Sequence, residues 1–161
     1  MENFFLRDGA SKSFDPEYIL FRGKSTDTHE WVYGWYEMSA FGRWPVKPSI
    51  IPMQDAKDGL YTHIQIDPQT LGMFSGLRDR DGTPIYSGDV VKNHLGIQQV
   101  CIFERGSFWF VESVDFCYGE RQGENFCACS KRYKDAEKGI TMDKVIGNIF
   151  DNPELVAKYV D

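Results

Sequence analysis

The pattern of apolar and polar positions predicts short β-strands joined by tight turns along most of the chain. Two apolar runs, residues 19–24 and 30–38, flank a polar segment and therefore predict a β-hairpin. In the second run Trp31, Tyr33 and Trp35 share one face by the two-residue period of a strand. Further strands are predicted over residues 60–66, 90–92, 97–104, 107–114 and 144–150.

Two chain reversals are predicted in the glycine-rich stretch 71–91. The first centres on Asp81-Gly82, a common turn dipeptide in which glycine supplies a positive φ. Pro84 steers the residue before it to extended geometry, and residues 87–89 make the second bend. The acidic residues of the first turn are interpreted as turn formers paired with neighbouring arginines, that is, Asp79 and Asp81 with Arg78 and Arg80.

Segments without strand periodicity separate these runs. Residues 39–59 contain three prolines, and because proline lacks the N–H of a β-ladder we expect an irregular or edge segment there. Residues 131–138 favour a short helix. Another short helix is predicted near the C-terminus, with Asn152 as its cap and Pro153 in its first turn.

Together these elements predict a mostly β fold: a small barrel-like antiparallel domain, SH3-like or related, with a short C-terminal helix. With 161 residues the chain is close to the commonest size of a single domain. We place this domain at residues 18–161. Residues 1–17 show no periodicity and are expected to be poorly ordered or loosely packed.

The net charge of −6 argues against a protein that grips nucleic-acid phosphates, because such binding depends on lysine and arginine. Basic residues gather in one region, but acidic residues alternate with them, so we interpret it as a solvated face. Its basic members are Arg121, Lys131, Arg132, Lys134 and Lys138. The chain lacks an apolar run long enough for a membrane helix and the pattern of a signal peptide, so we expect a soluble, cytoplasmic protein.

The cysteines are the best candidates for a metal site. Cys127 and Cys129 would point to one face of an extended segment, and Cys117 precedes them. A structural zinc site needs three or four ligands and is best signalled by two C-x-x-C pairs, which this chain lacks. We therefore interpret the cysteines as reduced, small apolar residues, and we expect no metal or cofactor.

Candidate catalytic residues are few. Nucleophilic catalysis needs a serine or cysteine beside a base, which is usually a histidine. The histidines His29, His63 and His94 stand in no recognisable catalytic frame, and no phosphate-binding glycine motif follows a predicted strand. We therefore predict that the protein is not an enzyme, with an unrecognised enzyme as one alternative.

Aromatic residues are the candidates for binding a partner: Trp35, Tyr36, Trp44 and Trp109. Such residues stack bases in single-strand-binding barrels, which makes a weak nucleic-acid-binding β-barrel the other alternative. The acidic balance of the chain disfavours nucleic acid as the partner. Aromatic residues of β domains also belong more often to the core.

Four stretches of the chain resemble the signature of the YopX family of phage and prophage proteins. They are FRGK at residues 21–24, WVYG at 31–34, FSGLRDRDGTPIYSGDVV at 74–91 and VIGNIFDNPEL at 145–155. Residues 112–143 show no such match, and Met73 stands where the family pattern has a glutamine. The resemblance implies a mostly β fold encoded by a phage or prophage, and it implies no particular biochemical role.

These observations predict a non-enzymatic protein-protein interaction module that binds a host or phage protein. They also predict self-association. The strand 107–114 carries three consecutive aromatic residues, and Glu112 is its only charge, so it is poorly protected if it lies at a sheet edge. We expect a homo-oligomer at micromolar concentration that Trp109→Glu weakens.

Overall fold

The protein structure, a computed structural model, describes residues 20–39, 47–53, 55, 58–59, 61–117, 119, 123–125 and 132–156. It is mostly β, and its strand pairs are antiparallel apart from one short parallel pair. Its helix α2, Ser113–Cys117, is a single short turn. The predicted fold class is confirmed, although the two described sheets do not close into a barrel.

Eight strands form the larger sheet, in the order β11-β12-β5-β1-β2-β3-β4, with β6 paired to β5. These strands are β1 Phe21–Lys24, β2 Trp31–Ser39, β3 Lys47–Pro52, β4 Ile64–Gln65, β5 Gly72–Arg78, β6 Pro84–Tyr86, β11 Tyr133–Asp135 and β12 Ile140–Thr141. β1 and β2 form the predicted hairpin. The first residues of β5 pair with β1, and its last residue pairs with β12 and β6.

Five strands form the smaller sheet, in the order β10-β9-β8-β7-β13. They are β7 Asp89–Lys92, β8 Gln98–Glu104, β9 Ser107–Glu112, β10 Glu124–Asn125 and β13 Lys144–Asn148. Helix α2 packs against β8 and β9. Two 3-10 turns complete the described elements: η2, Pro68–Thr70, precedes β5, and η5, Pro153–Leu155, follows β13.

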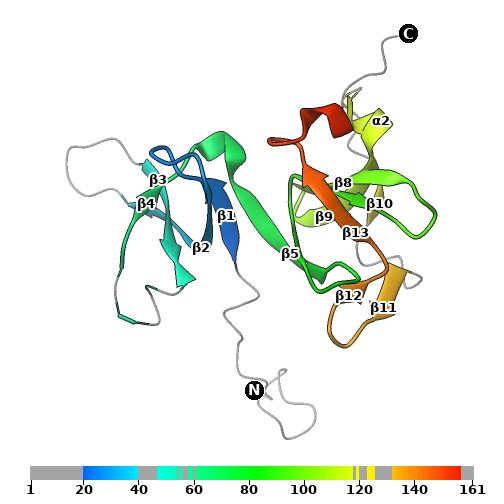
Figure 1. Ribbon diagram of the computed structural model, residues 1–161, viewed down its shortest axis with the longest axis horizontal. Coiled ribbons are helices and arrows are strands. Elements are labelled where there is room, and N and C mark those ends of the chain that lie inside the picture. The colour runs from blue at the N-terminus through cyan, green and yellow to red at the C-terminus, as the bar shows by residue number, and fades with distance from the viewer. Residues whose placement is uncertain are drawn as a thin grey trace, which may run out of the picture.

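Figure 1 shows the chain as two lobes, with the green strand β5 running from one to the other. The first lobe contains β1 to β4, and the second contains the smaller sheet together with β6, β11 and β12. The core of the second lobe is an apolar cluster of Leu77, Ile85, Val91, Cys101 and Phe110, each at most 2% exposed. Because β5 belongs to both lobes, the residues beside this strand determine how the two lobes are joined.

Two glycines of the signature stretches let the strands of the first lobe approach closely. A Cβ on Gly34 would lie 2.0 Å from the carbonyl oxygen of Ile51, and a Cβ on Gly23 would lie 2.5 Å from Cδ1 of Ile66. A larger residue at either position would push neighbouring strands apart, and tightly packed interiors resist such displacement.

Both predicted reversals in residues 71–91 are confirmed. Gly82 has φ +89 in the turn between β5 and β6, and Gly88 has φ +90 in the turn before β7. Asp67 forms a further turn, because its side chain accepts a hydrogen bond from the backbone N–H of Gln69 at 3.0 Å. Short-range turn chemistry therefore determines these connections.

The expectation of an irregular or edge segment over residues 39–59 is wrong for β3, which lies between β2 and β4. The prolines are tolerated because of where their nitrogens face. The carbonyl of Pro48 accepts a hydrogen bond from Ile66, so the polar backbone groups of this residue face β4 rather than β2. Because the nitrogen of Pro48 faces β4, its missing N–H removes no hydrogen bond from the long β2–β3 ladder. On the other side, β4 pairs with Ser49 and Ile50 of β3.

The strand β9 does not lie at an edge of the smaller sheet, which was the condition for its predicted self-association. It pairs with β8 along its whole length, and Trp109 and Phe110 pair with β10 on its other side. Phe110 is 1% exposed and belongs to the core, while the ring of Phe108 packs on Phe103 with centroids 4.9 Å apart. The edge argument for self-association therefore does not apply to this strand.

Two further predictions are corrected in the C-terminal part. Residues 131–138 contain β11, which pairs with β12, instead of a helix. Arg132 is no solvated residue either. It is 4% exposed, its Nε lies 2.6 Å from Oδ2 of Asp143, and its Nη2 donates to Gln99 at 2.9 Å. Through these contacts the buried arginine fixes the start of β11 to Gln99 on β8 and to Asp143 beside β13.

The predicted C-terminal helix is present as the 3-10 turn η5. Asn152 does not cap it, because the side-chain oxygen of Asn152 accepts a hydrogen bond from the backbone N–H of Asn148 at 3.3 Å. This loop-closing bond replaces the capping bond that sequence reasoning expects. Tyr159, which a longer helix would include, lies outside the described residues.

Candidate functional site

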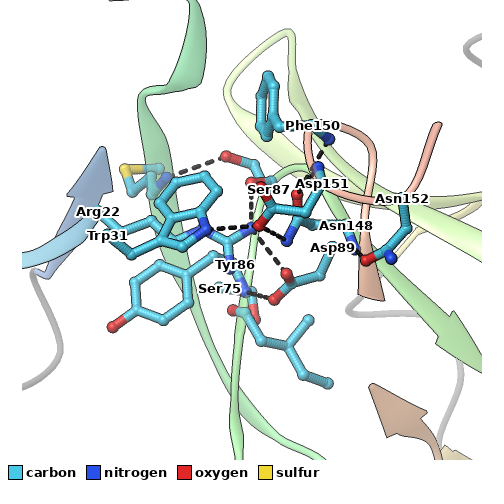
Figure 2. Close-up of polar contacts among 12 residues, drawn as sticks. Arg22, Trp31, Ser75, Tyr86, Ser87, Asp89, Asn148, Phe150, Asp151 and Asn152 are labelled. Carbon is cyan, nitrogen blue, oxygen red and sulfur yellow. Dashed lines mark hydrogen bonds and ion pairs between the residues drawn. The ribbon is translucent and has the colours of Figure 1, made fainter. Parts of the chain in front are cut away.

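Residues from separate signature stretches meet where the two lobes join (Figure 2). Arg22 on β1 is 5% exposed, and its Nη2 lies 2.7 Å from Oδ1 of Asp89 at the start of β7, which is 2% exposed. The guanidinium also lies over the rings of Trp31 and Tyr86, 4.6 Å and 5.0 Å from their centroids. Because buried charges require such partners, the ion pair ties the first hairpin to the second lobe.

Burial changes the acidity of the groups at this junction. Oδ2 of Asp89 accepts a hydrogen bond from the backbone N–H of Tyr86 at 2.8 Å, which closes the turn before β7. Burial raises the pKa of Asp89, although the Arg22 charge and this hydrogen bond oppose the shift. Burial likewise raises the pKa of Tyr86 to about 12, so its hydroxyl keeps the proton at neutral pH.

A second link to the first hairpin comes from the loop after β13. The side-chain oxygen of Asn148 accepts hydrogen bonds from the backbone N–H groups of Phe150 and Asp151, at 3.0 Å and 2.9 Å. The loop then presents the Asp151 carboxylate to β1 and β2, where it accepts a hydrogen bond from Nε1 of Trp31 at 2.7 Å and contacts Nζ of Lys24. Partial burial opposes the charge, but hydrogen bonds from Lys24, Asn148 and Trp31 outweigh it and lower the pKa of this carboxyl to about 2.

Glycines make room for this loop. A Cβ on Gly147 would lie 2.4 Å from Oδ1 of Asn152 and 2.8 Å from Cδ1 of Leu155. A Cβ on Gly88 would lie 2.9 Å from the ring of Phe150. The C-terminal signature stretch therefore packs directly on β13 and on the turn before β7.

The turn between β5 and β6 is built on Asp79, which is fully buried. Its Oδ1 accepts hydrogen bonds from the backbone N–H groups of Asp81 and Thr83, both at 2.9 Å, and its Oδ2 accepts one from Val145 at 3.1 Å. Burial alone would raise the pKa of Asp79, but these bonds lower it below its ordinary value. Asp79 is thus a turn former, as predicted.

The predicted partners of these carboxylates are wrong. The cation is Lys144 on β13 rather than Arg78 or Arg80, with Nζ 3.2 Å from Asp79 and 2.7 Å from Asp81. The reason is topological, because β13 runs beside the turn and brings Lys144 to it. Bonds to both carboxylates raise the pKa of this exposed lysine.

A pocket of about 440 Å³ opens beside the junction. It is lined by residues of both lobes: Arg22, Tyr33, Thr83, Pro84, Tyr86, Asp89, Val145, Gly147 and Asn148. The ring of Tyr33 is 5.7 Å from that of Tyr86, and Tyr33 remains 47% exposed, which places it at the mouth. Pockets of this size with apolar walls and a few convergent polar groups are typical binding sites.

The described members of the aromatic set predicted to bind a partner, Trp35, Tyr36 and Trp109, do not line this pocket. Trp35 and Tyr36 are neighbours on β2, and both are half-buried. Trp109 lies on β9 in the other lobe, where its indole N–H donates to a backbone carbonyl at 3.2 Å. Trp44 lies outside the described residues. The structure therefore does not bring the described members of this set together.

The histidines also lie away from the pocket. Nδ1 of His63 is 2.9 Å from Glu37 in the first lobe, and His29 and His94 belong to the connections after β1 and β7. The buried thiol of Cys101 belongs to the core, where burial raises its pKa above the ordinary value. Such a neutral thiol is a poor nucleophile.

Only one of the three cysteines considered for a metal site belongs to the described residues. Cys117 ends helix α2 and donates a hydrogen bond through its thiol to the carbonyl of Val156. Cys127 and Cys129 lie outside the described residues. Within the part of the chain that the structure describes, no three metal-ligating side chains gather.

Sequence reasoning missed the residues that build the junction, above all Arg22, Tyr33, Tyr86 and Asp89. A usable signal was present. Arg22 is a charged residue inside a predicted strand, next to a glycine, and Asp89 follows a tight turn and precedes two valines. Charged residues in such positions are either exposed or paired, and the alternation pattern alone does not give the partner.

A comparison with protein-family models identifies the family of the chain. The model of the family described as YopX protein matches residues 20–157. No curated protein matches the chain. None of the helices that the structure describes is long and apolar enough to cross a membrane.

Proposed function

Because the chain belongs to the YopX family, we propose that it is a non-enzymatic interaction module of phage or prophage origin, whose pocket between the lobes binds a host or phage protein. The observation that carries this proposal is the pocket itself. Its walls come from strands of both lobes, and Tyr33 stands exposed at its mouth. A soluble protein in the host cytoplasm would meet such partners directly.

The alternatives have less support. A nucleic-acid binder would be expected to surround the pocket with unpaired lysine and arginine, whereas Arg22 and Lys24 are each engaged with a carboxylate. An enzyme would be expected to place a nucleophile beside a base there, and the described residues that line the pocket include neither histidine nor cysteine. We therefore favour binding of a protein over both.

The test is differential capture from phage-infected or prophage-induced host cells. The tagged protein, Tyr33→Ser and the control Tyr61→Ser are compared, since Tyr61 is 64% exposed and lies outside the pocket. We expect a protein that binds the wild type and Tyr61→Ser and is lost with Tyr33→Ser. Equal capture by all three proteins, or capture that nuclease abolishes, would contradict the proposal.

A further inference from the structure

We propose that the pocket between the lobes accepts an uncharged, aromatic or large apolar side chain of the partner protein, with a neighbouring peptide carbonyl oxygen set against Arg22. This inference rests on the proposed function and specifies the chemistry that the pocket recognises. Four features of the pocket support it: its charge balance, its unused hydrogen-bond donors, its apolar walls and its closed strand edge.

The charge balance favours an uncharged occupant. Among the described residues of the lining, Arg22 and Asp89 are the charged ones, and they form a direct pair. Lys24 and Asp151, the charged residues of the neighbouring link, also pair with one another. A carboxylate or phosphate entering the pocket would therefore add a net negative charge at a site whose cation already has a counter-charge, and burying such a charge is costly.

Hydrogen-bond donors remain available. The hydrogen bonds that the structure shows for the Arg22 side chain come from Nη2, which contacts Asp89 and the carbonyl of Ser87. Its Nε has no acceptor among the described residues, but almost none of its surface is exposed, so an entering oxygen reaches it only after a local shift of the Arg22 side chain. The hydroxyl of Tyr86 keeps its proton at neutral pH and is a further donor. An oxygen acceptor without charge, such as a peptide carbonyl, complements these groups.

The remaining walls are mostly apolar, with Thr83 and Asn148 as their polar members. Pro84 and Val145 face the pocket from the second lobe, and the ring of Tyr33 faces it from the first. The volume of about 440 Å³ lies toward the lower end of the usual range for ligand sites, about 300–1,000 Å³. An inserted side chain with its adjoining backbone suits this space, and aromatic side chains contribute the most contact area per residue.

The partner is expected to insert a side chain rather than to add a strand. β13 is the edge strand that borders the pocket. The backbone N–H of Val145 is already bound to Asp79, and that of Asn148 is bound to Asn152. Because these donors are occupied by the protein's own side chains, β13 offers little to an added strand.

The experiment is an NMR titration of the full chain labelled with ¹⁵N. The probes are N-acetyl-phenylalaninamide and N-acetyl-leucinamide, compared with acetate, inorganic phosphate and adenosine. We expect the two amides to shift the Nε–H resonance of Arg22 and the backbone resonance of Tyr33, with dissociation constants of about 1 mM. Tyr33→Ser should weaken this binding at least about threefold, and Tyr61→Ser should leave it unchanged.

The results of the titration and of the cellular capture together test the inference and the proposed function separately. Absence of amide binding at Arg22, tighter binding of acetate or phosphate, or preferential binding of adenosine would overturn the inference. If the amides fail while cellular capture still depends on Tyr33, the inference fails and the proposed function stands. If the amides bind and capture is independent of Tyr33, the proposed function fails and the pocket chemistry stands.

Discussion

Arg22 and Asp89 stabilise the junction between the lobes only as a pair. Both are almost completely buried, so removal of either leaves the other without solvent and without a counter-charge. The stacked rings of Trp31 and Tyr86 shield the guanidinium but carry no formal charge that could replace the carboxylate. The pair is therefore sensitive to single substitutions and more tolerant of a joint one.

We expect Asp89→Asn to lower the free energy of unfolding by about 3–5 kcal/mol, because Arg22 would stay buried without its counter-charge. The double variant Arg22→Met, Asp89→Asn should cost less than the sum of its single variants, since the two residues are coupled. Urea unfolding followed by tryptophan fluorescence measures all three proteins. Strictly additive losses would contradict the coupling.

Asp151 makes the stability of the junction depend on pH. Its pKa of about 2 in the folded protein lies below the ordinary value of about 3.9. As the pH falls, Asp151 therefore binds a proton in the unfolded chain at a higher pH than in the folded protein. The link therefore stabilises the fold above about pH 4 and is lost as the pH falls toward 2. Trp31→Phe removes one donor and should raise the pKa of Asp151.

The measurement is an NMR titration of the Asp151 side-chain carboxyl carbon. Trp109→Phe is the matched control, because its indole N–H donates to the backbone carbonyl of Glu104, at the turn end of the β8–β9 hairpin. We expect the pKa of Asp151 to rise in Trp31→Phe and to stay near that of the wild type in Trp109→Phe. The same pKa in all three proteins would show that Trp31 does not stabilise the charge.

Among the elements, those that depend on local turn chemistry are predictable from sequence. The turns at Gly82 and Gly88 occur where they were expected, because glycine can adopt a positive φ that other residues avoid. The alternation along β2 also correctly puts Trp31 and Tyr33 on one face, since both side chains point to the second lobe. Such signals need only a few neighbouring residues.

Elements whose role depends on distant partners are not predictable in this way. Whether Pro48 disturbs a ladder depends on which strand its nitrogen faces, and the register that decides this involves residues far along the chain. The pairing of β9 depends on β10, which no local pattern marks as a strand. The candidate site has the same difficulty, because Lys24 and Asp151 are 127 residues apart in sequence.

At the scale of the whole molecule, two of the described sheet edges, those of β6 and β13, are protected against further pairing. The edge of β6 begins with Pro84, which has no N–H, and the N–H of Tyr86 is bound to Asp89. The edge of β13 is covered by Asp79 and Asn152. Strand pairing at these two edges is therefore disfavoured, and the self-association that we retain as a proposal would use side-chain surfaces there.

We expect a homo-oligomer at micromolar concentration, measured by light scattering. Trp109→Glu, which changes the half-buried face of β9 beside Ile102, should weaken it. Phe103→Glu is the matched control, because Phe103 is 47% exposed and pairs with Phe108 on the opposite face of the same hairpin. A monomeric mass for the wild type at high concentration would refute self-association, and an equal effect of both variants would refute the choice of face.

The distance in sequence between Asp151 and its partners has a consequence for how the protein is made. The ribosome delivers the β1–β2 hairpin first, while the carboxylate that binds Trp31 follows 120 residues later. At a translation rate of about 5–20 residues per second, roughly 6–24 seconds pass between the synthesis of that hairpin and the synthesis of this partner. The nascent first lobe thus leaves its joining surface exposed throughout that interval, and a chaperone that shields this surface would act before residue 151 emerges.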